Sequence, residues 1–83
     1  MISFTGLKTA LRKFDECGTI ARCGDWSITN GGYDLHFEIY YQGRTVLQCI
    51  SNELKGGFRP FKDFTEDTET ELIKRVKAVY TDL

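Results

Sequence analysis

The sequence has little of what marks a secreted, membrane-spanning or disordered protein. Its longest apolar runs fall far short of the ~20 residues that cross a bilayer. Residues 1–6 lack the basic-then-apolar layout of a secretory signal. There is one proline, and 41% of the 83 residues are hydrophobic, as is typical of an ordered globular chain. We therefore expect one α+β domain over residues 1–83, with no membrane contact.

The cysteine content indicates the cellular compartment, and the net charge limits the classes of partner. The three cysteines, Cys17, Cys23 and Cys49, are odd in number and share no Cys-x-x-Cys spacing. A small secreted scaffold would carry a denser, even set, so we expect reduced thiols and a cytoplasmic location. The net charge is −1, from 11 basic and 12 acidic residues, which gives no overall attraction to nucleic acid or to an anionic membrane.

No motif for catalysis, metal binding or cofactor binding is present. Zinc could be held only by the three cysteines with His36, and their wide gaps differ from the paired spacing of structural zinc sites. His36 is the single histidine, and Asp34 and Glu38 share its face of an open strand rather than a water-excluding pocket. The two Gly-Gly pairs lack the spacing of a phosphate-binding loop. The sequence therefore predicts a non-enzymatic protein without cofactor or metal.

The most regular pattern lies between Tyr33 and Tyr41. Every odd residue there is apolar or aromatic, and the even residues are polar except Tyr40. Because side chains on a strand alternate between faces, this pattern indicates a half-buried strand. Asn30-Gly31 before it and Gln42-Gly43 after it are turn signals, so we expect a β-meander.

The segment before the alternating strand is expected to pair with it. Residues 19–29 form the expected first strand, with either a bulge or a break at Gly24-Asp25, and a two-residue turn at Asn30-Gly31 follows. This register places Ile28 opposite Tyr33 and keeps Trp26 on the same apolar face.

The second hairpin is left with two registers. If Gln42-Gly43 is the whole turn, the even positions of Val46–Ile50 join the core face. If Tyr41 belongs to a three-residue loop, the odd positions of Thr45–Cys49 join it instead. In both cases apolar residues point outward, so the third strand needs cover. Cover by a second copy would make a homodimer through strand 44–51.

Two amphipathic helices flank the strands. The first is expected over residues 4–17, capped by Ser3 or Thr5 and ended by Gly18. Its apolar stripe consists of Phe4, Leu7, Ala10, Leu11 and Phe14.

The pattern after residue 64 predicts a second amphipathic helix, which begins either at Thr65 or at a capping box formed by Thr68 and Glu71. Its apolar stripe consists of Leu72, Ile73, Val76, Val79, Tyr80 and Leu83. Helices with one apolar stripe each pack most simply against one face of a three-stranded antiparallel sheet. The predicted fold is an α+β two-layer sandwich with the order α-β-β-β-α.

This element order, with His36-Phe-Glu-Ile-Tyr-Tyr-Gln-Gly43, resembles the double-stranded-RNA-binding domain, whose second strand and turn are similar. The resemblance covers the middle of the chain and implies a nucleic-acid-binding module. That family places a lysine cluster at the start of its last helix, whereas this chain has an acidic run at Thr65–Glu71. Phosphate contacts supply most of the affinity for a duplex, so nucleic acid is kept only as the alternative to a protein partner.

By elimination, the sequence predicts a protein-interaction domain that acts as a regulator, inhibitor or subunit by occupying a partner's surface. In size and element order it is similar to the small single-domain proteins with which phages and mobile elements block host enzymes. Aromatic and cationic residues are enriched at hot spots, and an acidic patch steers a basic partner. The connection after the third strand has this composition, although its three Phe are most simply a lid over the core or over the third strand. The candidate partner-binding residues are Phe58, Arg59, Phe61, Lys62, Tyr40, Tyr41, Arg44, Glu66, Asp67 and Glu69.

We expect no retention of the protein on duplex RNA at low salt, because the acidic start of the second helix repels phosphates. An electrophoretic shift assay with a true double-stranded-RNA-binding domain as the positive control checks this. Retention that weakens steeply with added salt would support the nucleic-acid alternative instead.

Overall fold

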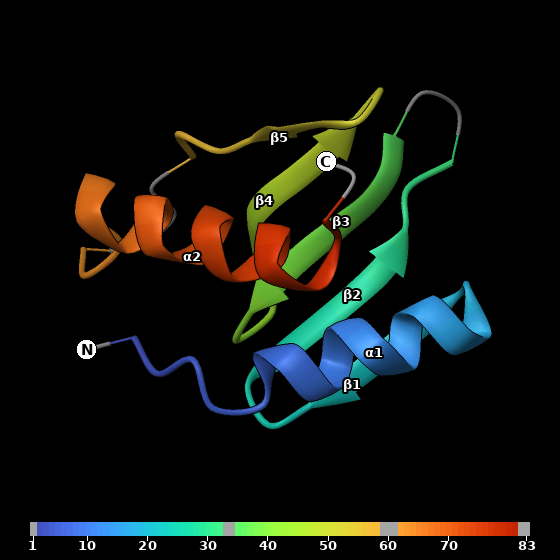
Figure 1. The fold of residues 1–83 in the computed structure, drawn as a ribbon. Helices are drawn as coiled ribbons and strands as arrows, with labels where there is room; N and C mark the ends of the chain where they lie inside the picture. The colour runs from blue at the N-terminus through green and yellow to red at the C-terminus, as the bar shows by residue number, and fades with distance from the viewer. Residues whose placement is uncertain (1, 33–34, 59–61, 82–83) are drawn as a thin grey trace.

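The computed structural model describes residues 2–32, 35–58 and 62–81. In this part of the chain two helices and five strands form an α+β arrangement, with both helices lying across one face of the sheet (Figure 1). No helix among the described residues has the length and apolar content to cross a membrane. The elements are α1 (Leu7–Cys17), β1 (Ile20–Cys23), β2 (Trp26–Asn30), β3 (Leu35–Tyr41), β4 (Arg44–Ile50), β5 (Glu53–Lys55) and α2 (Glu66–Val79).

The expected order α-β-β-β-α is confirmed in part: a helix stands at each end of an antiparallel meander, but the chain forms two further strands. The sheet is an antiparallel meander in the order β1-β2-β3-β4-β5. Residues 19–29 divide into β1 and β2 around the Gly24-Asp25 turn, across which Cys23 pairs with Trp26. β5 lies in the expected connection and pairs with residues 48–50 of β4. Both added strands are too short for an alternating pattern to reveal them.

The register between β2 and β3 differs from the expected one, although the buried face is the same. Ile28 pairs with Ile39, not with Tyr33, which lies outside the described residues. Trp26 pairs with Tyr41. The shift is an even number of residues, so each side chain keeps its face, and Trp26 and Ile28 are buried as expected. Alternation determines the face of a strand, but not the length of the loop that joins it to the next.

A β-bulge in β4 determines which residues of the second hairpin face the core. The turn is the two-residue Gln42-Gly43, as one of the two expected registers requires. Beyond it, Thr45 and Leu47 pair with consecutive residues of β3, so Val46 is an extra, unmatched residue. The bulge changes the parity of the strand, and Val46, Leu47 and Cys49 are all buried. The expectation that one apolar set of this strand must point outward is therefore wrong.

β5 also limits the edge that β4 presents. Residues 48–50 of β4 are paired with β5, and the bulge interrupts the ladder near the turn. Bulges and short covering strands are common means of blocking edge-to-edge pairing. A homodimer through strand 44–51 stays a prediction, and residues 44–47 are the part of that edge outside the pairing with β5.

The N-terminal segment is held to the sheet by Trp26. The indole N–H of Trp26 donates to the carbonyl oxygen of Ser3 at 2.8 Å, and its ring stacks on Phe4 with centroids 5.8 Å apart. The backbone N–H of Ser3 donates to the hydroxyl of Tyr41. Buried indole and phenol groups need such partners, so these contacts determine where the chain enters α1.

Glycine, not a polar side chain, stands at the start of α1. The expected caps Ser3 and Thr5 are wrong, since Gly6 occupies the cap position with φ 93 and no side-chain hydrogen bond. A Cβ at Gly6 would lie 2.7 Å from the carbonyl oxygen of Cys23, so the β1–β2 turn leaves no room for one. The helix ends at Gly18 with φ 72, as expected.

The start of α2 follows the simpler of the two expected caps. Thr65 is the N-cap, and its hydroxyl accepts the backbone N–H of Thr68 at 3.3 Å. The capping box at Thr68–Glu71 is therefore wrong. The first turn carries three acids, which the helix dipole favours there.

Gly6→Ala should destabilise the fold more than Gly18→Ala. Both positions have a positive φ, which costs an alanine about 1–2 kcal/mol. Only at Gly6 does the added Cβ also meet backbone, whereas nothing lies within 4 Å at Gly18. Urea unfolding followed by the fluorescence of Trp26 measures both losses of unfolding free energy. Equal losses would contradict the close approach of the β1–β2 turn to Gly6.

Candidate functional site

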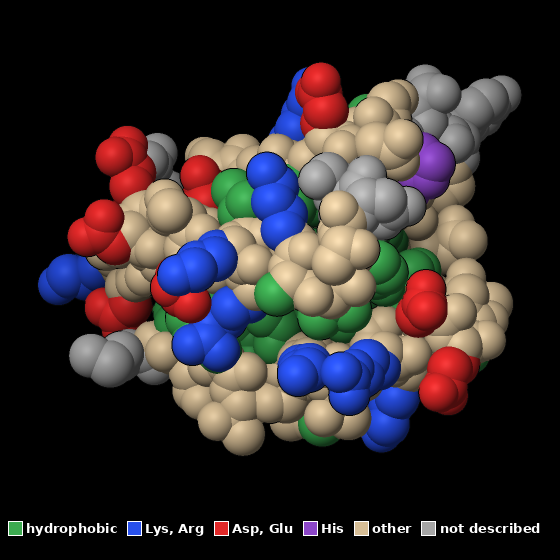
Figure 2. All heavy atoms as spheres, viewed as in Figure 1, with side chains coloured by type: hydrophobic (Ala, Val, Ile, Leu, Met, Phe, Trp, Pro, Cys, Tyr) green, Lys and Arg blue, Asp and Glu red, His purple; other side chains and the backbone are tan. Residues whose placement is uncertain are grey.

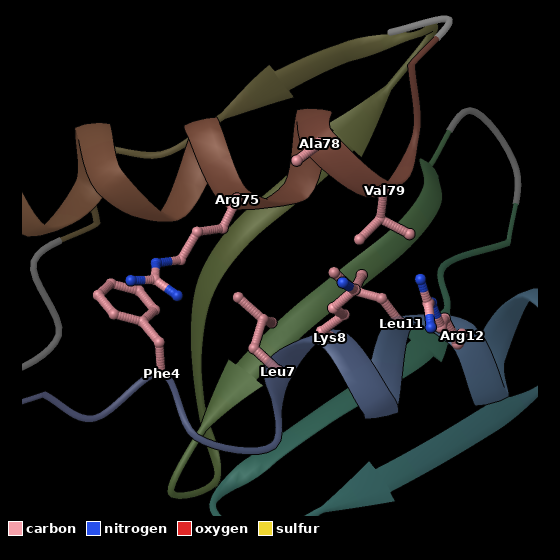
Figure 3. Close-up of a pocket in the computed structure, with 8 residues that line it drawn as sticks. All are labelled: Phe4, Leu7, Lys8, Leu11, Arg12, Arg75, Ala78 and Val79. Carbon is pink, nitrogen blue, oxygen red and sulfur yellow. The ribbon is translucent and has the colours of Figure 1, made fainter.

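A hollow between α1 and α2, here called the interhelical groove, opens on the helical face of the molecule (Figures 2 and 3). Its volume is about 330 Å³, near the lower end of the ~300–1,000 Å³ usual for ligand pockets. It is lined by Phe4, Leu7, Lys8, Leu11, Arg12, Arg75, Ala78 and Val79.

The floor of the groove is apolar because each helix turns part of its stripe toward the other. Leu7 and Leu11 on α1 are buried, and Val79 on α2 is half-buried above them (Figure 3). Leu83, expected at the end of the α2 stripe, lies outside the described residues. In Figure 2 the apolar surface remains visible between the helices, so neither helix closes the groove.

The rim of the groove (Lys8, Arg12 and Arg75) is cationic. Lys8 and Arg12 lie one turn apart on α1, and Arg75 lies on α2. Among the described residues no acidic side chain lines the groove. Figure 2 shows Lys and Arg side chains gathered over the middle of this face, with acidic side chains toward its two sides. The groove thus combines an apolar floor with a positive potential.

The three cations of the rim differ in whether a carboxylate within the protein already neutralises them. The Nε of Arg75 is 2.8 Å from Oε2 of Glu71, and its guanidinium lies 4.5 Å from the ring centroid of Phe4. Arg75 is therefore partly neutralised and held in place by a cation–π contact. Lys8 and Arg12 have no carboxylate within ion-pair distance among the described residues. The uncompensated charge lies on the α1 side.

Tyr80 joins the two helices at one end. Its hydroxyl donates to the carbonyl oxygen of Leu11 at 3.2 Å, and its ring lies 5.5 Å from that of Phe37. Burial, with smaller electrostatic contributions from Asp15 and Cys49, raises the pKa of Tyr80 to about 12. The phenol is neutral at physiological pH and ties the end of α2 to α1.

The connection after β5 is partly lid and partly exposed. Phe64 is buried in the core, as the lid interpretation predicts, whereas Phe58 is 44% exposed and Lys62 is also exposed. Arg59 and Phe61 lie outside the described residues. The structure therefore divides this expected binding segment, and Phe58 and Lys62 stay predictions as partner-binding residues.

The second hairpin contributes less than expected. Tyr41 is only 5% exposed and packs 4.8 Å from Trp26 between ring centroids, so it belongs to the core and not to a partner surface. Its odd position in the alternating pattern already pointed inward. Tyr40 is half-buried on the opposite face of the sheet, and Arg44 is exposed beside the turn.

The expected acidic patch lies at the start of α2. Glu66 and Asp67 are exposed there. Glu69 has a structural role, because its carboxylate accepts the backbone N–H of Gly57 and so holds the connection against the helix. None of these acids lines the interhelical groove.

The sequence interpretation placed the apolar lining of the groove on the two helix stripes, but it missed the cationic rim and Ala78. Lys8, Arg12 and Arg75 were compatible with solvated helix faces, and Ala78 carries no signal of its own. The one available clue is the spacing of Lys8 and Arg12, one turn apart and beside the apolar stripe of α1. That spacing cannot show that α2 comes to lie opposite.

A second hollow, of about 370 Å³, is lined by several titratable side chains. It is lined in part by Asp15, His36, Cys49 and Tyr80. Burial raises the pKa of the Cys49 thiol, so Cys49 and Tyr80 both remain protonated and offer no activated nucleophile. In the described ranges, no three His, Cys, Asp or Glu side chains form a group that could hold a metal ion.

No protein-family model matches the chain, and neither curated proteins nor solved structures give a significant match. The expected likeness to the double-stranded-RNA-binding domain was based on an α-β-β-β-α order and on the segment His36–Gly43, and the chain departs from that order with five strands in its described part.

Tyr80→Phe should make the fold less sensitive to alkaline pH. The pKa of Tyr80 is about 12 in the folded protein against 10.0 as its ordinary value. Tyr80 therefore stabilises the fold below about pH 10, and this contribution is lost as the pH rises toward about 12. The variant should lose about 0.5–1.5 kcal/mol at neutral pH with its hydrogen bond to Leu11. Urea unfolding at several pH values, with Tyr40→Phe as control, measures the difference. The same alkaline loss in Tyr80→Phe as in the wild type would contradict it.

Proposed function

We propose that the protein is a non-enzymatic interaction domain that binds a segment of a partner protein in the interhelical groove. The observation that carries this proposal is an open apolar floor under a cationic rim, with no acidic lining among the described residues. Bound in this way, the domain would act as a regulator, inhibitor or subunit by occupying part of its partner's surface.

The distribution of polar groups supports binding over chemistry. No polar or charged residue is buried among the described residues. Catalysis relies on acid, base or nucleophilic groups held in a site that excludes water. A groove whose cations all stand at an open mouth suits recognition, in which apolar anchors enter the floor and charges set the orientation.

The composition of the groove, with an arginine on an aromatic ring, is of the kind that is enriched at binding hot spots. Arg75 stacks on Phe4, and arginine and aromatic residues are enriched where interfaces gain most of their energy. Apolar surface rimmed by polar groups is also the usual mark of an interaction site. The groove therefore comes before the connection at residues 58–62 and the second hairpin as the proposed centre of the partner-binding surface.

Ala78→Trp should weaken partner binding strongly without unfolding the domain. Ala78 lines the groove, but its position on α2 is exposed, so an indole there fills the groove at little expense to the core. Thr9→Trp is the matched control, because Thr9 is an exposed residue of α1 that does not line the groove.

The measurement is affinity capture from native extract with quantitative mass spectrometry, alongside circular dichroism of each variant. We expect one set of proteins to be captured by the wild type and by Thr9→Trp, and reduced about tenfold or more with Ala78→Trp. Capture that survives Ala78→Trp unchanged would place the interaction elsewhere, with Phe58 and Lys62 as the next surface to test.

A further inference from the structure

We infer that the segment bound in the interhelical groove is acidic and amphipathic, with apolar side chains on the floor and carboxylates against Lys8 and Arg12. This inference rests on the proposed function and names the chemistry of the partner.

The charges of the rim select an anion. Lys8 and Arg12 stand one turn apart on α1, a spacing at which like charges repel. Neither has a counter-charge within ion-pair distance among the described residues, whereas Arg75 is already paired with Glu71. A carboxylate placed between Lys8 and Arg12 would relieve that repulsion, and the apolar floor beside them weakens screening by water.

The floor selects an apolar side chain on the same ligand. Leu7, Leu11 and Val79 form a surface of hydrocarbon in a hollow of about 330 Å³. A purely polar anion would leave this surface in contact with water, whereas an aliphatic anchor buries it. The two helices that bound the hollow run alongside each other in Figure 1, so a third helix can seat its row of side chains between them.

The extent of the positive surface selects a short segment. Acidic side chains lie toward both sides of the helical face in Figure 2. Exposed acids of the two helices include Glu66 and Asp67 at the start of α2 and Asp15 and Glu16 at the end of α1. A long polyanion laid along this face would meet these acids and be repelled. A brief acidic stretch of a protein chain contacts only the rim.

The test uses a fluorescein-labelled amphipathic peptide built from alternating Leu and Glu pairs, with binding read by fluorescence anisotropy. We expect binding to the wild type that weakens as salt is raised. Lys8→Glu with Arg12→Glu should weaken binding about tenfold or more, since two favourable charge contacts become repulsive. Lys13→Glu with Lys77→Glu is the matched control, because it changes the net charge equally at exposed positions outside the groove.

Two peptide analogues separate the contributions. Replacing each Glu by Gln should weaken binding to the wild type and remove the difference between the wild type and Lys8→Glu with Arg12→Glu. Replacing each Leu by Ala should abolish binding to both. Emission from Trp26, which stacks on Phe4 in the lining of the groove, gives a second readout without a label on the peptide.

Several outcomes would overturn the inference. These are no binding of the peptide, equal binding of the Gln analogue, and stronger competition by duplex DNA than by the unlabelled peptide. A dimer of the free protein in native mass spectrometry that Ala78→Trp dissolves would make a second copy the occupant. If the peptide fails while Ala78→Trp still blocks partner capture, the proposed function stands and only the acidic character of the partner is wrong.

Discussion

The burial of Trp26 is the interaction on which the rest of the structure depends. Its indole N–H must find a partner inside the fold, and it finds the carbonyl oxygen of Ser3. The same ring stacks on Phe4, so the sheet positions the segment that leads into α1. Phe4 in turn lies beneath Arg75 of α2, which makes it part of the groove lining. One buried aromatic therefore links the sheet, the entry to the first helix and the candidate site.

Two close backbone features then set the two layers against each other. The β1–β2 turn comes so near to Gly6 that no side chain fits there, and this determines where α1 begins. The bulge at Val46 turns the far half of β4 so that Leu47 and Cys49 also face the helices. With both in place, a single apolar face receives both helices, and the space that the helices leave between them becomes the groove.

Charge on the helical face is segregated rather than mixed. Acids occupy the start of α2, where the helix dipole favours them, and cations stand along the groove. The net charge of −1 gives no indication of this separation, because the acidic and basic residues nearly cancel in the total. Local potential over an apolar floor governs recognition, and overall charge is a poor guide to the chemistry of a partner.

The sequence by itself determined the α+β class, the inward face of β2 and β3 and the end of α1 at Gly18, because periodicity and turn chemistry act locally. It left two registers open at the second hairpin. It did not determine the β1–β2 split, the strand β5 or the bulge at Val46, since these depend on which distant residues supply the matching surface. The interhelical groove was beyond it for the same reason. Lys8 and Arg12 are unremarkable on a solvated helix, and only the packing of α2 beside α1 makes them the rim of an apolar hollow.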